Sequence, residues 1–415
     1  MELILTNSQE TAITEFKRFI YKGTEREFLL TGSSGVGKTT LIKWFIDALD
    51  KHNAMVDTKV AEGKLTDVFL LAPTHKAKGI LAEKTGLQTH TIHSALQLKM
   101  YFDKETGDQK FFKPKDVNNL IPDNTLVIVD EASMLDDFLL KEIQKGVPTG
   151  CKIVYLGDEF QLNPVGYETT PAFNQGVKPV ELTELTRANN PELAQLVVTL
   201  RNAVAFNTIP KIKKGNHIKL LDKAHFEKEM IGAFKNNEDA KVIAWRNKTV
   251  KDYNSIIHKS LSGSDDFFVG QQVIVNKSFR SNITALLNVE QQLTIHEIAG
   301  TDSKEINGEL LEFTKLVIDD DGTFIRVPSS KYKLNKALKQ FKTHKDWGSF
   351  YRYKEMFADI NDAYAITTHK CQGSSYSKVF VNLADIMRNP KRNEMLRLLY
   401  VACTRASDEL ILCKE

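Results

Sequence analysis

Short apolar runs recur along the chain, separated by longer stretches in which apolar residues have helical spacing. These runs are rich in β-branched residues and cover residues 28–30, 68–71, 126–129, 153–156, 242–245, 379–381 and 410–412. Uninterrupted apolar runs of this length are typical of parallel strands that are buried on both faces. Their alternation with helical segments predicts an α/β fold with doubly wound parallel sheets. The runs form two sets, before about residue 185 and after about residue 240, which indicates two such domains.

Two stretches interrupt this alternation. Residues 97–119 contain two segments rich in aromatic and basic residues around a polar stretch with Gly107, a pattern that predicts a β-hairpin. Residues 276–357 are polar, with strand-like pieces at 311–318 and 324–327 and then an aromatic and basic helix-like stretch at 331–357. We therefore expect a small β-rich insertion in the second half of the chain.

Composition and charge indicate which classes of protein this chain can belong to. The chain has 415 residues, 42% of them hydrophobic and 26% charged, which is ordinary for globular proteins and suggests two to four domains. The net charge of +3 means that a nucleic-acid site would be a local groove and not a basic coat. The four cysteines contain no C-x-x-C pair, which argues against zinc or disulfides and favours a reducing compartment. We expect neither a signal peptide nor a membrane span.

Residues 32–39 read G-S-S-G-V-G-K-T, a complete phosphate-binding loop between strand-like and helix-like segments. The loop needs backbone freedom so that its N–H groups can point at phosphate oxygens, which Gly32, Gly35 and Gly37 supply. Lys38 would reach the β- and γ-phosphates, and the Thr39 hydroxyl would hold Mg²⁺. The alternative, a glycine-rich turn with a surface lysine, does not explain the strand–loop–helix context. The sequence therefore predicts a nucleoside triphosphate site.

Candidate catalytic residues follow the later strands. Asp130 and Glu131 come directly after the run at 126–129, where Asp130 would bind Mg²⁺ and Glu131 would activate the attacking water. Adjacent acids alone could be solvated loop residues, but their position in a P-loop protein favours the site. Gln161 closes the next strand, and its amide could hydrogen-bond the γ-phosphate unless this is an ordinary polar loop. Arg187 and Arg405 are candidates for stabilising transition-state charge, although their spacing alone favours surface salt bridges.

These segments, in chain order, resemble the motifs of superfamily 1 helicases. The matched segments are Gln9 before the P-loop, 72–77 (motif Ia), 91–94 (Ib), 129–134 (II), 157–165 (III), Arg187 (IV), 365–374 (V) and 400–405 (VI). The H-K-C-Q-G sequence at 369–373 resembles the form found in the RecD-like branch of superfamily 1B DNA helicases, and the compact length resembles its phage members. Asn163 departs from the branch, because proline is more usual there. The resemblance spans residues 5–406.

The resemblance implies a domain organisation. Residues 1–96 and 120–185 would form RecA-like domain 1A, and residues 97–119 would form a hairpin domain 1B, the pin that splits the duplex. Residues 186–275 and 358–415 would form RecA-like domain 2A, with residues 276–357 as an SH3-like insertion called 2B. The expected fold is thus α/β, with two RecA-like P-loop domains, a small β-hairpin insertion and a small β-rich SH3-like insertion.

The resemblance also assigns roles to individual residues. Nucleotide contacts would come from Gln9, which reads adenine, and from Gly32, Gly35, Gly37, Lys38, Thr39, Thr40, Gln372 and Gly373. DNA contacts would come from Pro73, Thr74, His75, His93, Phe102, Phe111, Thr368 and His369. Hydroxyls and imidazoles can bond phosphates, and aromatic rings can stack on bases. The histidines could instead be structural, and Phe102, Phe111 and Phe112 could pack the base of the hairpin.

The function implied is that of an ATP- and Mg²⁺-dependent DNA helicase that moves 5′→3′ on single-stranded DNA and unwinds forked duplex DNA. It would act as a monomer in the cytoplasm of a bacterial or phage-infected cell, with single-strand-binding or replication proteins as candidate partners and no membrane. One alternative is a remodeller or loader that uses ATP to gate binding to single-stranded nucleic acid without processive unwinding, which would need no hairpin wedge. A P-loop kinase would need an acceptor pocket and would leave Gln372, Arg187 and Arg405 unexplained.

Overall fold

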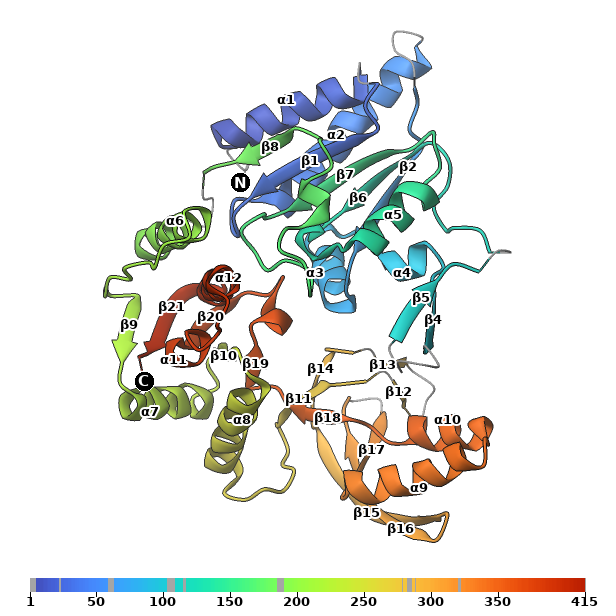
Figure 1. The fold of residues 1–415 in the computed structure, drawn as a ribbon, viewed down its shortest axis with the longest axis vertical. Helices are drawn as coiled ribbons and strands as arrows, with labels where there is room; N and C mark the ends of the chain where they lie inside the picture. The colour runs from blue at the N-terminus through green and yellow to red at the C-terminus, as the bar shows by residue number, and fades with distance from the viewer. Residues whose placement is uncertain are drawn as a thin grey trace. The chain divides into compact units, whose positions relative to one another are not determined.

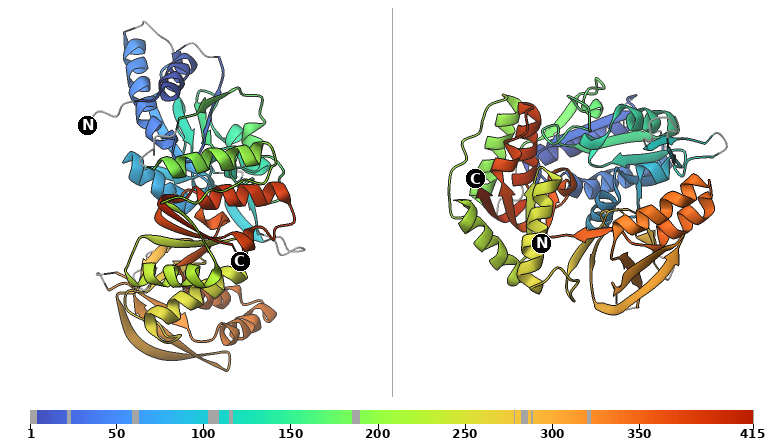
Figure 2. Two further views of the ribbon diagram at one scale, coloured as in Figure 1. Left: turned by 90° about the vertical axis from the view of Figure 1, so that its left-hand side faces the viewer. Right: turned by 60° about the horizontal axis from the view of Figure 1, so that its bottom comes forward.

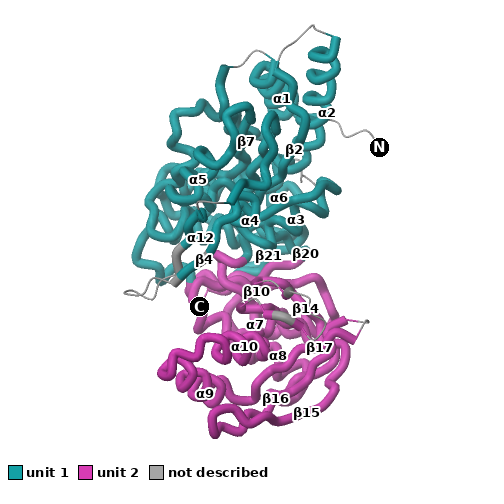
Figure 3. The backbone as a smooth tube through the Cα atoms, turned by 90° about the vertical axis from the view of Figure 1, so that its right-hand side faces the viewer, with its two compact units in different colours: residues 1–220, 371–377, 386–412 teal, residues 221–370, 378–385, 413–415 magenta. Residues whose placement is uncertain are grey.

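The computed structural model describes residues 5–21, 24–58, 63–102, 109–114, 117–184, 190–277, 279–281, 286–287, 289–319 and 322–414. The chain divides into two compact units (Figure 3). Unit 1 contains residues 1–220, 371–377 and 386–412, and unit 2 contains residues 221–370, 378–385 and 413–415. Among the described residues, no helix is both long and apolar enough to span a bilayer.

Unit 1 is built on a six-stranded parallel sheet with the order β3-β2-β6-β7-β1-β8. The strands are β1 (Glu27–Gly32), β2 (Asp67–Ala72), β3 (Thr89–Thr91), β6 (Thr125–Val129), β7 (Lys152–Gly157) and β8 (Pro179–Leu182). The strand predictions at 28–30, 68–71, 126–129 and 153–156 are confirmed. The short strands β3 and β8 were not predicted, because both lie at sheet edges and neither has an uninterrupted apolar run.

Alternate residues of these strands face opposite helical layers, as the two-residue period of a strand requires. Leu30, Leu70, Ile128 and Val154 pack with α1 (Asn7–Tyr21), α2 (Lys38–Asp57) and α3 (His75–Thr85). Their neighbours Leu29, Leu71, Val129 and Tyr155 pack with α4 (Ile92–Ala95) and α5 (Asp137–Gly146). Figure 1 shows the strands between these layers. Helices α6 (Pro191–Ala205) and α12 (Arg392–Cys403) contact each other within the same unit.

The predicted hairpin is confirmed by two antiparallel strands, β4 (Lys99–Phe102) and β5 (Gln109–Phe112). Lys99 pairs with Phe112 and Met100 with Phe111, so one face of the hairpin carries Phe111 and the other carries Phe112. The predicted turn at 103–108 lies outside the described residues.

A second sheet has the order β19-β10-β20-β21-β9. Its strands are β9 (Ile218–Leu221), β10 (Ala240–Ala244), β19 (Ala365–Thr367), β20 (Tyr376–Asn382) and β21 (Ala406–Cys413), with helices α7 (Lys223–Lys235), α8 (Asn247–Ser262) and α11 (Leu383–Ile386) nearby in sequence. Strand β10 pairs in parallel with β19 and β20, so the prediction of a second parallel sheet from 242–245 and 379–381 is confirmed. Strand β21 includes the run at 410–412.

The remainder of unit 2 is rich in antiparallel strands, which confirms the prediction of a β-rich insertion. The sheets are β14-β11-β18, β15-β16-β17 and β12-β13. Their strands are β11 (Gln272–Val275), β12 (Phe279–Arg280), β13 (Leu286–Leu287), β14 (Gln292–Thr294), β15 (Glu297–Ile306), β16 (Glu309–Val317), β17 (Phe324–Pro328) and β18 (Ile360–Asp362). Its SH3-like character stays a prediction.

The basic stretch after β17 is helical, as predicted. Helices α9 (Lys331–Thr343) and α10 (Trp347–Met356) lie beside this β-rich part (Figures 1 and 2). Leu334, Phe341 and Tyr353 pack on a core that includes Leu311 and Phe313 of β16. Residues 371–377 and 386–412 cluster with unit 1, whereas the sequence boundaries assign them to domain 2A, so the exact domain boundaries stay a prediction.

Candidate nucleotide site and strand-contacting surfaces

The P-loop connects β1 to α2 and has the backbone geometry that its glycines allow. Gly35 and Gly37 have φ values of 89° and 86°, in the left-handed region. Gly32 has no room for a side chain, because a Cβ there would lie 2.8 Å from Val36 Cγ2 and 2.9 Å from the Leu182 carbonyl oxygen. Lys38 Nζ donates to the carbonyl oxygens of Gly32 (2.7 Å) and Ser33 (3.0 Å), which holds its positive charge over the loop.

A residue of α2 and the acidic pair that follows β6 meet beside this loop. Thr39 Oγ1 donates to Asp130 Oδ2 at 3.4 Å, and Asp130 Oδ1 accepts from the Glu131 N–H at 2.9 Å. The Asp130 N–H donates to the Leu71 carbonyl oxygen of β2, which fixes the end of β6. A hydroxyl and a carboxylate at this spacing are oxygen donors of the kind that Mg²⁺ prefers together with phosphate oxygens and water. The donor set at Thr39 and Asp130 therefore fits Mg²⁺.

Glu131 is held in an unusual conformation. Its φ of 53° is left-handed, which is sparsely populated by residues other than glycine and is a mark of functional sites. Burial raises the pKa of its carboxyl, and the neighbouring Asp130 charge raises it further, while Lys38 and Arg405 oppose the rise. Burial also raises the pKa of Asp130, against the Glu131 N–H and Lys38. A carboxyl with a raised pKa is better matched to accepting a proton near neutral pH.

Motifs III and V each supply a buried amide to this region of unit 1. Gln161 Oε1 and Gln372 Nε2 are buried and have no hydrogen-bond partner among the described residues. Gly373 has a φ of 75°, and a Cβ built on it would lie 3.5 Å from Glu131 Oε1, so motif V approaches the candidate base closely. Buried amide atoms without partners cost stability, so they indicate a polar ligand that would satisfy them. Gln372 Nε2 is a donor that a phosphate oxygen would satisfy, whereas Gln161 Oε1 is an acceptor that a water molecule would satisfy.

Arg405 lies in unit 1 with the P-loop and is only 2% exposed. Its guanidinium donates to the carbonyl oxygens of Val401 (3.1 Å) and Ser374 (3.2 Å) and to Thr404 Oγ1 (3.1 Å). These partners are neutral, so they orient the guanidinium without cancelling its charge. The surface salt-bridge alternative therefore does not describe Arg405. Arg187 lies outside the described residues.

Three residues to which the sequence assigned no individual role connect motif III to helix α12. Tyr400 Oη donates to Asp158 Oδ2 at 2.7 Å, and the burial of Tyr400 beside that carboxylate raises its pKa well above the ordinary value. Arg397, one turn earlier on α12, donates to the carbonyl oxygens of Glu159 (2.5 Å) and Gln161 (2.6 Å). The i, i+3 spacing of Arg397 and Tyr400 could have indicated a shared face, but nothing in the sequence identified the loop that it contacts.

Gln9 fastens α1 to the P-loop. Its Nε2 donates to the Val36 carbonyl oxygen at 3.0 Å, and its Oε1 accepts from the Thr6 N–H at 3.0 Å. Both ends of the amide are thus engaged within the protein, and the predicted adenine contact stays a prediction. Thr40, at the start of α2, is exposed.

The predicted strand-contacting residues of motifs Ia and Ib lie at the start of α3 and α4. Thr74 caps α3, with its hydroxyl accepting from the Ala77 N–H at 3.1 Å, and Pro73 before it is half-buried. The pKa values of His75 and His93 are both lowered, chiefly by burial, so both rings are neutral near pH 7 and would contact phosphates by hydrogen bonding and not by charge. The His93 ring lies 4.3 Å from the Phe111 ring.

The hairpin therefore has one inward and one outward aromatic face. Phe111 packs on His93, in agreement with the alternative that it supports the hairpin base. Tyr101 and Phe112 are 43% and 44% exposed, and their rings meet edge to face at 5.6 Å. Sequence reasoning omitted Tyr101, although strand alternation places it on the same face as Phe112. Phe102 pairs with Gln109 in the backbone register.

Motif V begins with β19 in unit 2, and its residues 371–374 belong to unit 1. Thr368 is fully buried, and its hydroxyl donates to the Ala244 carbonyl oxygen at 3.3 Å, whereas His369 is exposed. Thr367, one position earlier, lines a pocket of about 960 Å³ within unit 2. Sequence reasoning missed Thr367, because the paired threonines gave no indication of which one faces the pocket.

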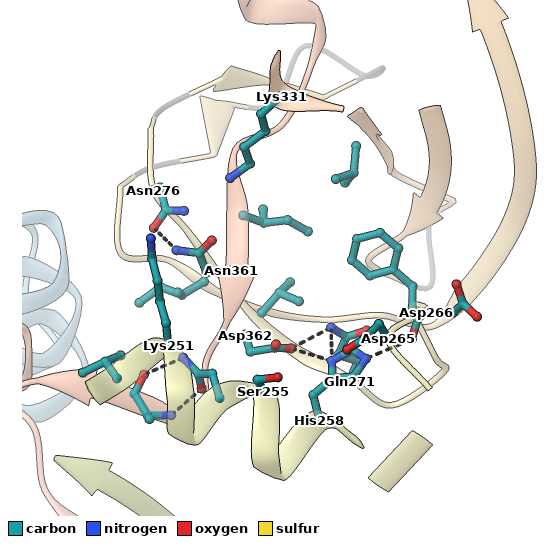
Figure 4. A pocket seen from close by; sticks show the side chains of 18 of the residues that line it. Lys251, Ser255, His258, Asp265, Asp266, Gln271, Asn276, Lys331, Asn361 and Asp362 are labelled. Atoms are coloured by element: carbon teal, nitrogen blue, oxygen red, sulfur yellow. Dashed lines mark hydrogen bonds and ion pairs between the residues drawn. The ribbon is translucent and has the colours of Figure 1, made fainter. Parts of the chain in front are cut away.

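The pocket of unit 2 has a basic, amide-rich side (Figure 4). Lys251 of α8 and Lys331 of α9 point toward Asn276 and Asn361, and Asn361 Nδ2 donates to Asn276 Oδ1 at 3.3 Å. Side-chain amides and lysine ammonium groups that face a polar cavity can donate hydrogen bonds to the phosphates of a DNA strand.

The opposite side of the pocket is a closed polar network. His258 Nδ1 lies 3.2 Å from Asp362 Oδ1, and Gln271 Nε2 donates to the same oxygen at 2.7 Å. His258 Nε2 lies 3.0 Å from the Asp266 carbonyl oxygen. Since these groups satisfy one another, this side fixes the pocket wall. On the lysine side, Lys331 Nζ and Asn276 Nδ2 donate to Asp359 Oδ1 at 2.7 and 3.2 Å, so this carboxylate neutralises part of the positive charge there.

Comparisons with known proteins give consistent matches. Residues 5–223 match the family described as AAA domain, and residues 362–413 match the UvrD-like helicase C-terminal domain. The chain is 29% identical to the ATP-dependent DNA helicase dda of Enterobacteria phage T4, over 97% of each chain. It is 34% identical to the ATP-dependent RecD2 DNA helicase of Deinococcus radiodurans over 40% of this chain and 20% of that protein.

Among solved structures, the Pif1 helicase from Bacteroides in complex with ADP-AlF3 and ssDNA matches 99% of this chain and 92% of its own. The TM-score is 0.52 at 16% sequence identity, so this likeness concerns the fold alone. It agrees with the prediction of parallel-sheet cores of the RecA-like kind.

Proposed function

The chain belongs to the AAA-domain family, and we propose that it is an ATP-dependent DNA helicase that moves 5′→3′ along single-stranded DNA and unwinds duplex DNA. The relatives named ATP-dependent DNA helicase dda and RecD2 DNA helicase support this function. The observation that carries it is the meeting of Lys38, Thr39, Asp130 and Glu131 in one unit with an oriented Arg405. The buried, unpartnered amides of motifs III and V belong to the same unit.

Each residue of this group has a distinct task in ATP hydrolysis. Lys38 and the P-loop N–H groups would neutralise the β- and γ-phosphates. Thr39 and Asp130 would hold Mg²⁺, which when bound supplies further charge neutralisation at the phosphate oxygens. Glu131, with its raised pKa, would accept the proton of the attacking water, and Arg405 would stabilise the charge of the transition state.

Helix α12 would connect hydrolysis to the rest of the motor. Its residues Arg397 and Tyr400 hold the loop of Gln161, and its C-terminal end leads to Arg405. A change at the γ-phosphate that Gln161 senses would therefore reach Arg405 through a single rigid element. Such a two-state element is what a nucleotide-driven motor needs.

The strand would contact several surfaces, each described within its own unit. In unit 1 these are the residues of motifs Ia and Ib, His75 and His93, and the exposed aromatic pair of the hairpin. In unit 2 the lysine and amide side of the pocket, with Thr367, would bond the phosphates. We also propose that the protein acts as a monomer in the cytoplasm of a bacterial or phage-infected cell, with single-strand-binding or replication proteins as candidate partners.

A strand-displacement assay tests the function. The full-length protein, ATP and Mg²⁺ are mixed with duplexes that carry either a 5′ or a 3′ single-stranded tail, with Glu131→Gln as the matched inactive control. We expect displacement of the 5′-tailed duplex only. Displacement of the 3′-tailed duplex alone would reverse the polarity. ATPase activity stimulated by single strands without any displacement would favour the remodeller, which needs no wedge such as Tyr101 and Phe112.

A further inference from the structure

The helical hairpin α9–α10 concentrates positive charge, and among its basic residues only Lys331 lines the strand pocket. Residues 331–356 contain eight Lys or Arg and two Asp or Glu, a net charge of +6 in a chain whose overall net charge is +3. The apolar side of the hairpin is already used, because Leu334, Phe341 and Tyr353 pack on the β-rich core. The basic residues other than Lys354 are exposed, and two of them, Lys331 and Lys336, are already paired with Asp359 and Glu309.

A group of aromatic and basic side chains surrounds the buried ring of Phe350 on this hairpin. Trp347 meets Phe350 edge to face at 6.0 Å, and Tyr351 does so at 5.1 Å. Lys342 Nζ lies 5.0 Å from the centre of the Phe350 ring, and Lys354 Nζ lies 5.6 Å from it. Trp347 and Tyr351 are 50% and 42% exposed. The four side chains form one connected surface, which we call the α10 surface.

Like charges crowd at the α10 surface. Partial burial lowers the pKa of Lys354, and the charges of Lys277 and Lys342 lower it further. Within the described residues neither Lys342 nor Lys354 forms an ion pair, whereas Lys277 lies 3.6 Å from Asp359. A polyanion would relieve this repulsion, and a merely solvated lysine face would not need two exposed aromatic rings among the charges.

The α10 surface is also continuous with the strand pocket. Asn276 lines the pocket, Lys277 is the next residue, and the charge of Lys277 acts on Lys354. Helix α10 contacts β12, which follows directly in the chain. A chain of phosphates in the pocket would therefore reach Lys354 past Lys277.

We propose that Lys277 and the α10 surface form a second binding site for single-stranded DNA, which extends the strand path beyond the pocket. The exposed rings of Trp347 and Tyr351 favour a single strand over a duplex, because only unpaired bases offer free faces for stacking. Lys342 and Lys354 flank these rings and would bond the adjoining phosphates. The choice of DNA as the polyanion rests on the proposed function.

Binding measurements on the full-length protein test this site. Fluorescence anisotropy would follow two labelled oligothymidylates, the shortest that fully stimulates the ATPase and one twice as long. The variants are Trp347→Ala/Tyr351→Ala and Lys342→Ala/Lys354→Ala, and the matched control is Lys228→Ala/Lys235→Ala on α7, which removes the same number of lysines from an exposed helix face. Thermal unfolding checks that the exposed substitutions leave the fold intact.

We expect the aromatic variant to bind the long oligonucleotide about tenfold more weakly and the short one as wild type. The lysine variant should lower the slope of log affinity against log salt by about 1.4, since each lost contact to a single strand removes about 0.7. Wild-type affinity of both variants for the long oligonucleotide would overturn the site. A loss seen only with blunt duplex would assign the surface to duplex phosphates and would also overturn it. Failure of the wild type itself to bind oligothymidylate would instead contradict the proposed helicase function.

Discussion

The candidate nucleotide site of unit 1 and the pocket of unit 2 that we propose to contact the strand are constructed differently. In unit 1 the P-loop and the Asp130–Glu131 pair each directly follow a buried parallel strand, and the carboxyl ends of such strands meet at one edge of a sheet. In unit 2 the pocket is lined by residues between 247 and 370, drawn from helices, loops, antiparallel strands and the parallel strand β19. In the proposed account the chemistry thus depends on a few groups at one sheet edge, whereas strand binding is spread over residues from many elements.

This difference predicts unequal responses to mutation. A buried group that opposes phosphate charge has no substitute within the site, so its loss should be nearly complete. A phosphate contact among several should cost little by itself, and its loss should appear mainly as salt-dependent affinity. Hydrolysis and strand binding should therefore be separable.

The largest effect is expected at the P-loop. Lys38→Ala should abolish ATP hydrolysis, because within the described residues no other cation is held over the loop by its carbonyl oxygens. Single-stranded DNA binding, measured by anisotropy without nucleotide, should stay near wild type. Lys43→Ala, on the exposed side of the same helix, serves as the control. If Lys38→Ala also lost DNA binding, hydrolysis and strand binding would not be separable, and the contrast between the two regions would be wrong.

The second-largest effect on hydrolysis is expected from the removal of Arg405. Arg405→Ala should slow hydrolysis by about 10³-fold and weaken nucleotide binding only modestly, since such a group acts mainly on transition-state charge. The same outcome is expected for Arg187→Ala. Steady-state ATPase with saturating DNA measures turnover, nucleotide titration measures affinity, and Arg392→Ala at the exposed start of α12 is the control. Normal hydrolysis in both variants would remove the arginines from the site.

A smaller and more selective effect is expected at the hairpin. Opening a base-pair step costs about 1.4 kcal/mol, which stacking on an aromatic wedge could partly offset. Tyr101→Ala/Phe112→Ala should reduce displacement of a 5′-tailed duplex about tenfold and leave single-strand-stimulated ATPase near wild type. Deletion of residues 103–110 should be more severe. Phe111→Ala, and Phe102→Ala if that residue faces the fork, should give milder losses.

Two outcomes would change the assignment of the hairpin. Equal losses of ATPase and displacement would mean that it only supports the structure. Full displacement without it would place the duplex-splitting element elsewhere, most plausibly in residues 276–357.

The smallest effect concerns stability and pH. Because burial raises the pKa of Glu131 above its ordinary value of 4.5, the folded state binds this proton more tightly than the unfolded state does. Stability is therefore lost as pH rises from 4.5 through the raised pKa. Glu131→Gln should melt about 2–4 °C higher than wild type at pH 8 and no higher at pH 4, while Glu83→Gln on the exposed side of α3 should show no such difference. If the difference in melting temperature between Glu131→Gln and wild type did not change with pH, the raised pKa of Glu131 would be wrong.

The sequence predicted most where structure depends on neighbours in the chain. The run at 126–129 is apolar throughout because both faces of β6 are buried, and the acids after it follow directly. Strands β3 and β8 escaped prediction because edge strands need no apolar run. The contacts of Tyr400 with Asp158 and of Phe111 with His93 join residues far apart in the sequence, so no local pattern indicated them.

The sequence also could not predict which way individual side chains point. Thr367 and Thr368 are chemically identical, yet Thr368 donates into the protein and Thr367 lines the pocket. The aromatic residues of the hairpin likewise divided between two faces only once the register was known.

The most direct test of the account is single-turnover hydrolysis by Glu131→Gln with single-stranded DNA present. The substitution keeps the shape of the side chain but removes its capacity to accept a proton. The account predicts that nucleotide and DNA affinities stay near wild type while the hydrolysis rate falls about 10²-fold or more. Wild-type turnover in the purified variant would contradict the assignment of Glu131 and, with it, the nucleotide site as described.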